Sequence, residues 1–151
     1  MQIVQGSEVK AFLKTAKRVY LCGKLENPDL DTHCHTEGLE IGISSYPRYT
    51  AELPHLHRWN WEYNYVIRGE VKAFLFAEQK EYHLHEGDLF VITADMPYIT
   101  KCLPGTEVLF VKNPGGNDKE LLPVTKSIRD WQACWENRME EEENGRQQAE
   151  A

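Results

Sequence analysis

The chain has 151 residues, of which 41% are hydrophobic and 27% charged, a composition typical of one soluble globular domain. Its formal net charge of −7 argues against a nucleic-acid partner, because phosphate binding needs a basic surface. Neither a long apolar run nor a basic-then-apolar N-terminus is present, so we expect no membrane span and no secretory signal. The four cysteines are scattered without a C-x-x-C pair, and we interpret them as reduced thiols of a cytoplasmic protein.

Residues 1–38 are expected to form an N-terminal helix and a leading strand. Ser7 resembles a helix N-cap, and apolar residues at helical spacing follow it to about Lys17. The run Val19–Cys22 then predicts a strand.

Residues 39–113 have a different pattern, in which short β-type runs alternate with turn residues. The predicted strands are Glu62–Arg68, Val71–Ala77, Tyr82–His85, Asp88–Ile92, Tyr98–Cys102 and Val108–Lys112. Many short strands at close spacing indicate an antiparallel sandwich or barrel.

Residues 114–143 are expected to form an extension that contains a second helix. Ser127 with Asp130 resembles a capping box at its start. The apolar face of this helix is expected to consist of Ile128, Trp131, Trp135 and Met139. We expect that face to dock against the barrel or a partner subunit. Residues 144–151 are polar and are predicted to be disordered.

Two histidines and an acid form the most informative pattern in the chain. His55 and His57 are one residue apart, so their side chains point to the same face of a strand. If the chain returns so that Glu62 joins them, two imidazoles and one carboxylate meet. That set suits a catalytic divalent metal such as iron, manganese, nickel or zinc. Asn64 shares the strand parity of Glu62, so it is expected to point inward, where it needs a substrate, a water or a structural hydrogen bond.

Other candidate groups allow more than one interpretation. Trp59 and Trp61 either wall a pocket that accepts a sugar or aromatic substrate, or pack the end of the barrel. His33 and His35 could complete a metal shell, but we favour an ordinary, partly exposed pair near a loop. His83 and His85 alternate with Tyr82 and Leu84, which predicts that both histidines face outward if the latter two face the core.

The motifs of this sequence resemble those of the cupin superfamily. The spacing of His55, His57, Glu62 and Gly69 is similar to the first cupin motif, and Gly87–Ile92 is similar to part of the second. The resemblance implies a small antiparallel jelly-roll β-barrel that holds a metal inside its mouth. It also implies that His55, His57 and Glu62 are metal ligands, and that the protein forms a homodimer.

The second motif departs from the family at one position. Where cupins usually supply a histidine as the fourth ligand, this sequence has Tyr98. Tyr98 is either a ligand or a group close to the metal, a general acid or base on a metal-bound substrate, or the mark of a barrel that has lost metal and keeps a ligand pocket.

Two functions follow from the resemblance. The first is a metal-dependent enzyme that acts on a small polar molecule, such as a sugar derivative or a keto acid, by isomerase, lyase or dioxygenase chemistry. In that case Tyr98 and Glu62 are the catalytic groups. The alternative is a non-enzymatic barrel that binds a small ligand as a sensor or accessory protein with a degenerate metal site.

Overall fold

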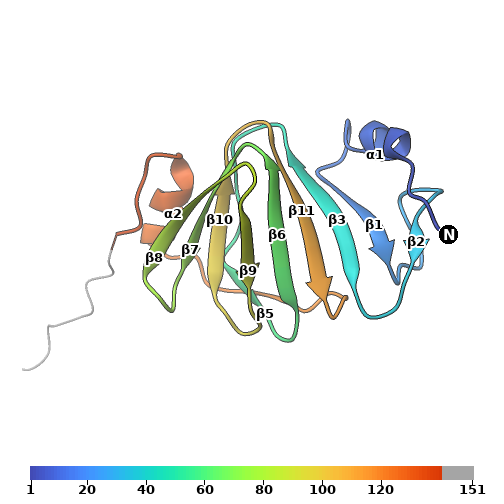
Figure 1. Ribbon diagram of the computed structural model, residues 1–151. Helices are drawn as coiled ribbons and strands as arrows, with labels where there is room; N and C mark the ends of the chain where they lie inside the picture. The colour runs from blue at the N-terminus through green and yellow to red at the C-terminus, as the bar shows by residue number, and fades with distance from the viewer. Residues whose placement is uncertain (141–151) are drawn as a thin grey trace, which may run out of the picture.

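The computed structural model describes residues 1–140 and shows a β-barrel with one short helix at each end of the chain (Figure 1). The prediction of a disordered tail at 144–151 falls outside these residues. The helices are α1 (Gly6–Phe12) and α2 (Lys126–Ala133). The strands are β1 (Arg18–Gly23), β2 (Cys34–His35), β3 (Glu40–Tyr46), β4 (Thr50–Ala51), β5 (His55–His57), β6 (Trp61–Arg68), β7 (Glu70–Leu75), β8 (Lys80–His85), β9 (Leu89–Ile92), β10 (Tyr98–Cys102), β11 (Thr106–Asn113) and β12 (Lys119–Leu121).

Two sheets form the walls of the barrel. One sheet has the strand order β2-β1-β3-β11-β6-β9, and the other has the order β12-β5-β10-β7-β8, with β4 added beside β10. All pairings are antiparallel except that of β1 with β2. The expected antiparallel jelly roll is therefore confirmed, and the predicted strands all form, with small shifts at their ends.

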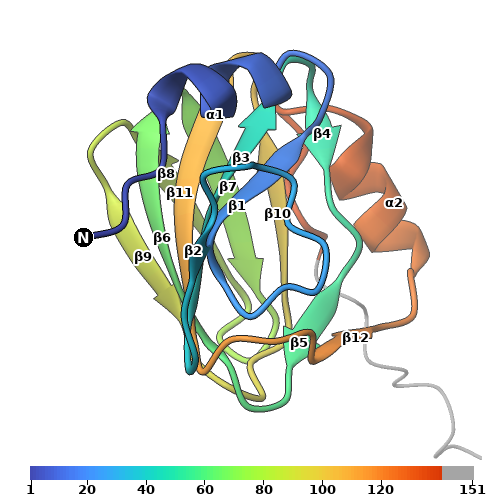
Figure 2. The same ribbon diagram turned by 90° about the vertical axis from the view of Figure 1, so that its right-hand side faces the viewer.

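Apolar side chains from both sheets fill one end of the barrel. In β3 and β11 alternate residues are buried, as expected for strands with one face toward a core. Val66, Val71 and Val108 meet there, and Leu84 and Phe90 pack against them. β5 and β12 lie at the other end of the barrel (Figure 2). The buried side chains of these strands and of the residue before β12 include the polar groups of His55, His57 and Asp118.

The helix α2 covers the outer face of the second sheet. Phe74 and Ile99 of the sheet pack against Ile128 and Trp131 of the helix. Lys101 is fully buried below the end of α2, and its ammonium donates hydrogen bonds of 2.9 Å to the carbonyls of Trp131, Cys134 and Asn137. A lysine thus satisfies carbonyls that the end of a helix leaves unpaired.

Both helices differ from the prediction at their ends. The N-cap of α1 is Gln5, without a side-chain cap, so the expected cap at Ser7 is wrong. The N-cap of α2 is Thr125, which accepts from the N–H of Ile128, so the expected capping box at Ser127 is also wrong. Because α2 ends at Ala133, Trp135 and Met139 lie beyond the helix rather than on its face. No described helix is long and apolar enough to cross a membrane.

Gly69 has a physical reason to be glycine. It lies between β6 and β7 with φ of +83°, a left-handed conformation that favours glycine. A Cβ atom there would lie 2.6 Å from Cα of Thr106, which is too close for a real contact. The hydroxyl of Thr106 also bonds the N–H and carbonyl of Glu70 at 3.1 Å, so the neighbouring backbone is held in place.

Candidate metal and substrate site

The two histidines of β5 lie inside the polar end of the barrel. His55 is 1% exposed and His57 is 3% exposed. β5 is paired with β12 on one side and β10 on the other, and His55 lies directly opposite Tyr98. The ring centroids of His55 and Tyr98 are 4.4 Å apart, and those of His55 and His57 are 5.4 Å apart. The structure therefore brings three of the four predicted ligands together.

Both histidines are held by hydrogen bonds at Nδ1. Nδ1 of His55 lies 2.8 Å from the carbonyl of Leu53, and Nδ1 of His57 lies 2.7 Å from Oδ1 of Asp118. A carbonyl and an ionised carboxylate only accept, so each Nδ1 donates. In the neutral ring of His55 this leaves the lone pair on Nε2. Imidazoles that bind a metal are usually fixed by such a bond at the other nitrogen.

Glu62, the third predicted ligand, approaches from β6. Its Oε2 lies 3.4 Å from Nε2 of His57. A lone pair on Nε2 and a carboxylate oxygen repel each other unless a proton or a cation lies between them. The donor set therefore fits a divalent cation, and His55, His57 and Glu62 are the residues that would hold it. Their donor atoms do not all lie within 4.8 Å of one another, so a shared ion has to draw the three side chains closer.

The protonation states suit this role. Burial lowers the pKa of His55 to about 4, so the ring is neutral at pH 7. The pKa of Asp118 is lowered. Burial alone would raise it, but the hydrogen bonds that the carboxylate accepts from the N–H groups of Trp59 and Asn60 and from His57 have the larger combined effect. Burial, together with the charge of Glu62, raises the pKa of Tyr98 well above its usual value. The phenol is therefore protonated at neutral pH, and its hydroxyl makes no hydrogen bond within residues 1–140.

A cavity of about 310 Å³ opens beside these residues, and a narrower extension of about 30 Å³ leads deeper into the barrel. His55, His57, Glu62 and Tyr98 line the cavity, and Asn64 lines the extension. The amide nitrogen of Asn64 is buried without a hydrogen-bond partner. Asn64 thus points inward as predicted, and no structural hydrogen bond satisfies its Nδ2 donor in the described part of the chain.

Arg18 of β1 lines both spaces, although no sequence motif marks it. Its Nε donates to Oγ of Ser44 at 3.0 Å, and its guanidinium lies 4.8 Å from the centroid of the Phe110 ring. Among the described residues it forms no ion pair within 4.0 Å. Lys112, by contrast, is paired with Glu40 at 3.8 Å. The outer N–H groups of Arg18 therefore remain for a ligand.

Asp118 is the second functional residue that sequence reasoning missed. Its Oδ1 accepts from His57, and its Oδ2 accepts from the N–H groups of Trp59 at 2.9 Å and Asn60 at 2.8 Å. It lies 61 residues after His57 and just before β12, a strand that the sequence pattern did not predict. Only the pairing of β12 with β5 brings the two residues together.

The remaining candidates lie elsewhere. Trp59 and Trp61 are 54% and 46% exposed and are not among the residues that line the cavity. His33 bonds the carbonyls of Tyr20 and Gly23, and His35 is exposed beside Glu37. His83 and His85 face outward, as predicted from their strand parity.

Comparison with known proteins finds a family match for the barrel part of the chain. Residues 42–111 match the family described as cupin domain, in agreement with the resemblance of the sequence motifs. The structure of KdgF from Halomonas sp. is 25% identical, with a TM-score of 0.51, and the match covers 57% of this chain and 77% of that one. A protein with a double-stranded β-helix domain from Klebsiella pneumoniae is 18% identical, with a TM-score of 0.50, and the match covers 58% of this chain and 77% of that one.

A third similar structure is Streptomyces PAC13 with uridine, a protein described as a nucleoside dehydratase. It is 13% identical, covers 58% of this chain and 71% of that one, and has a TM-score of 0.51. Identities of 13% and 18% show a shared fold alone. No curated protein matches the chain.

Proposed function

We propose that this cupin is a metal-dependent enzyme that acts on a small carboxylate-bearing molecule, such as a sugar acid or a keto acid, by isomerase or lyase chemistry. The observation that carries the proposal is the state of the two histidines. Each is fixed through Nδ1, and Nε2 of His57 faces the carboxylate of Glu62 beside a polar cavity. Iron, manganese, nickel and zinc all accept such ligands.

We base the substrate class on two donors without a protein partner, although the carboxylates of Glu40, Glu52 and Glu62 also line the cavity. Arg18 offers guanidinium N–H groups, and Asn64 offers a buried amide N–H that has no partner in residues 1–140. Both groups donate, so they fit a ligand that carries acceptors. A guanidinium binds a carboxylate with two parallel hydrogen bonds. A carboxylate at Arg18 would orient the rest of the molecule toward His55 and Glu62.

The chain supplies groups for proton transfer. A bound divalent ion contributes Lewis-acid polarisation of a substrate oxygen. The hydroxyl of Tyr98 lines the cavity without a protein partner among the described residues, and we assign it the role of proton donor to a substrate oxygen. The carboxylate of Glu62 is the candidate proton acceptor. Together these groups suit proton transfer next to a carbonyl, which underlies isomerisation and elimination. The dioxygenase alternative needs molecular oxygen as a second substrate.

A second candidate is a small-ligand-binding barrel without catalysis. It is favoured by Tyr98 at the position of the usual fourth ligand, and by donor atoms of His55, His57 and Glu62 that are spread beyond 4.8 Å. In that case Arg18 and Asn64 would still bind an acceptor-rich ligand.

Metal content and turnover test the proposal. We expect the purified protein to bind one ion in the barrel that His57→Ala removes, whereas the control His35→Ala, at an exposed histidine outside the cavity, keeps it. Tyr98→Phe is expected to retain the ion and lose turnover of keto acids or sugar acids. If the protein takes up none of the four metals in the barrel, the enzyme proposal is wrong. If Tyr98→Phe also loses the ion, Tyr98 is a ligand instead.

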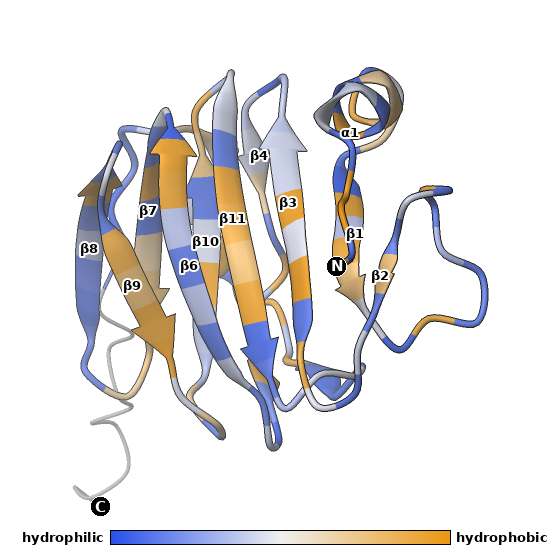
Figure 3. Cartoon of the chain, turned by 45° about the vertical axis from the view of Figure 1, so that its right-hand side comes forward, coloured by the Kyte–Doolittle hydropathy of each residue, from blue (hydrophilic) through white to orange (hydrophobic). Residues whose placement is uncertain are grey.

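We also propose that the protein forms a homodimer through the outer face of the first sheet. Tyr65 of β6 lies opposite Leu89 of β9, and both are exposed together with the nearby Trp61 and Val91. Figure 3 shows the apolar colouring of β9 beside β6. An uncharged patch of this kind suits a self-complementary contact. Sedimentation analysis should show a dimer that Leu89→Glu dissociates; a monomeric wild-type protein would refute this proposal.

The cytoplasm remains the proposed location. All four cysteines are free, which fits a reducing compartment. Fractionation of cells that express the tagged chain would test it, and recovery of the chain outside the cytoplasm would contradict it.

A further inference from the structure

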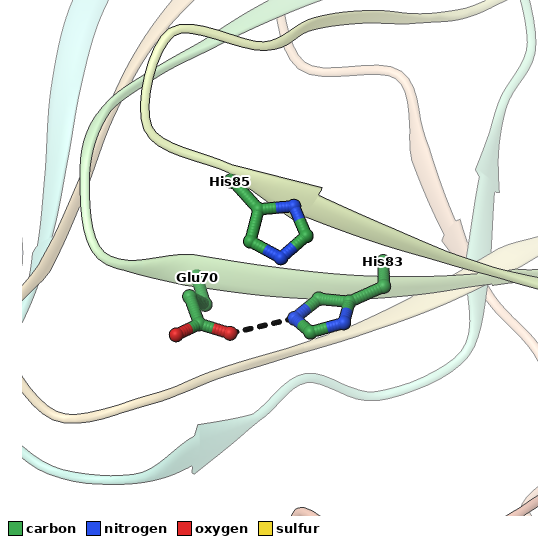
Figure 4. A group of neighbouring side chains, drawn as sticks. All are labelled: Glu70, His83 and His85. Atoms are coloured by element: carbon green, nitrogen blue, oxygen red, sulfur yellow. Dashed lines mark hydrogen bonds and ion pairs between the residues drawn. The ribbon is translucent and has the colours of Figure 1, made fainter.

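A second group of metal-binding side chains lies on the outside of the barrel. This group consists of Glu70 of β7 and of His83 and His85 of β8 (Figure 4). Their ligand atoms all lie within 4.8 Å of one another, and within residues 1–140 no other set of three His, Cys, Asp or Glu side chains meets this spacing. The side chains are 38% to 59% exposed, so an ion could reach them directly from solvent.

The pairing of β7 with β8 builds this group. Glu70 lies directly opposite His85, and His83 is two residues away on the same face of β8. Nε2 of His83 lies 2.6 Å from Oε2 of Glu70, and the two imidazole rings are 4.2 Å apart between centroids. Adjacent strands thus hold two imidazoles and one carboxylate in a fixed relation that does not depend on a loop.

The surroundings of the group favour a cation. Asp88 accepts a hydrogen bond from the N–H of His85, and its carboxylate lies 3.8 Å from Nδ1 of that ring. Lys72 lies opposite His83, but its ammonium donates to the carbonyl of Trp135 at 2.9 Å and pairs with Glu81 at 3.4 Å. The charge of this lysine is therefore paired, while the carboxylates of Glu70 and Asp88 lie beside the imidazoles.

From this arrangement we infer that Glu70, His83 and His85 form a surface site for a divalent ion of the zinc, nickel and copper class. Two neutral imidazoles and a carboxylate are the ligands that these ions prefer, and water completes the coordination at an exposed site. An ion bound at Nε2 of His83 would take the place of the hydrogen bond between that nitrogen and Glu70, with the ring N–H then on Nδ1. The site lies at the Glu70 end of β7, whereas Tyr98 of the cavity pairs with Leu75 at the other end. It is therefore separate from the barrel interior.

Bound metal should join β7 to β8 and stabilise the hairpin, because an ion that binds only the folded state adds to the free energy of unfolding. The ring of Trp135 lies 5.4 Å from that of His83, between centroids. A paramagnetic ion such as Cu²⁺ bound there should quench the fluorescence of this tryptophan. Quenching gives a readout that depends on neither activity nor the barrel site.

The test uses Zn²⁺ titration by calorimetry in the His57→Ala background, in which the barrel site is disabled. We expect this variant to bind one Zn²⁺, and the further changes His83→Gln and His85→Gln to weaken that binding by at least about tenfold. His35→Gln is the matched control, because His35 is also an exposed histidine beside an acid. Cu²⁺ quenching should be lost in the same variants.

Two outcomes would overturn the inference. One is a His57→Ala protein that binds no Zn²⁺. The other is Zn²⁺ binding that the His83 and His85 changes leave intact, which would place the ion elsewhere. Loss of the barrel ion in His57→Ala has no bearing on this surface site, so failure of one proposal is distinguishable from failure of the other.

Discussion

Asp118→Asn should change the tautomer of His57 from one that can bind a metal through Nε2 to one that cannot. The two oxygens of Asp118 have different tasks: Oδ2 accepts from the N–H groups of Trp59 and Asn60, while Oδ1 accepts from Nδ1 of His57. In the variant the remaining oxygen serves the two backbone donors, so the new NH₂ group faces Nδ1. The imidazole then moves its proton to Nε2, where it donates to Glu62 instead of binding a metal.

The expected magnitude follows from this geometry. Loss of a carboxylate behind a metal-binding histidine lowers affinity by about 10- to 100-fold, or about 1.4 to 2.7 kcal/mol. The metal-free protein should lose little stability, because both backbone donors keep an acceptor. Asp118→Ala instead leaves the N–H groups of Trp59 and Asn60 without a hydrogen-bond acceptor, which should lower the free energy of unfolding by about 1 to 3 kcal/mol for each group.

The assay is a chelator competition for the barrel ion, run with His83→Gln and His85→Gln to silence the surface site. Urea unfolding in the presence of chelator gives the stability of each variant. Metal binding by Asp118→Asn as tight as that of the parent would refute the assigned role of Asp118. The assignment also fails if Asp118→Asn and Asp118→Ala lose the same stability, since that would point to a general disruption.

Three further predictions concern stability. His55 has a pKa near 6.5 in the unfolded chain and about 4 in the folded protein, so its contribution to stability is full above pH 6.5 and is lost as the pH falls toward 4, by about 3 kcal/mol. His55→Gln should therefore flatten the pH dependence of the free energy of unfolding, measured by urea, between pH 6.5 and 4. An unchanged dependence would contradict the assignment. Lys101→Met removes the donor to three carbonyls and should cost about 2 to 3 kcal/mol, with a changed near-ultraviolet signal from Trp131; equal stability by thermal melting would refute it. Gly69→Ala places a Cβ 2.6 Å from Cα of Thr106 in a left-handed conformation and should cost about 3 kcal/mol, whereas a loss below about 1 kcal/mol would show that the turn adapts.

The outline of the fold could be read from the chain because it depends on local patterns. Alternating apolar residues and intervening turn residues predicted the barrel strands, and the first cupin motif predicted which of them carry His55, His57 and Glu62. Strand parity placed Asn64 inside the barrel and His83 and His85 outside it. These inferences needed only the two-residue period of a strand. Helix ends were predicted less well: Thr125, whose side chain caps α2, lies two residues before Ser127, and Gln5 begins α1 without a side-chain hydrogen bond.

Contacts between distant segments were decided only by the tertiary structure. Asp118 reaches His57 across 61 residues because β12 adds to the edge of β5, and Arg18 reaches the cavity because β1 joins the sheet beside β3. Glu70 meets His85 because a hairpin places them in register. The sequence by itself determined the ligand types and the faces on which they lie. It could not determine the partners of those residues, because strand pairing and register across long separations are set by the packing of the whole barrel.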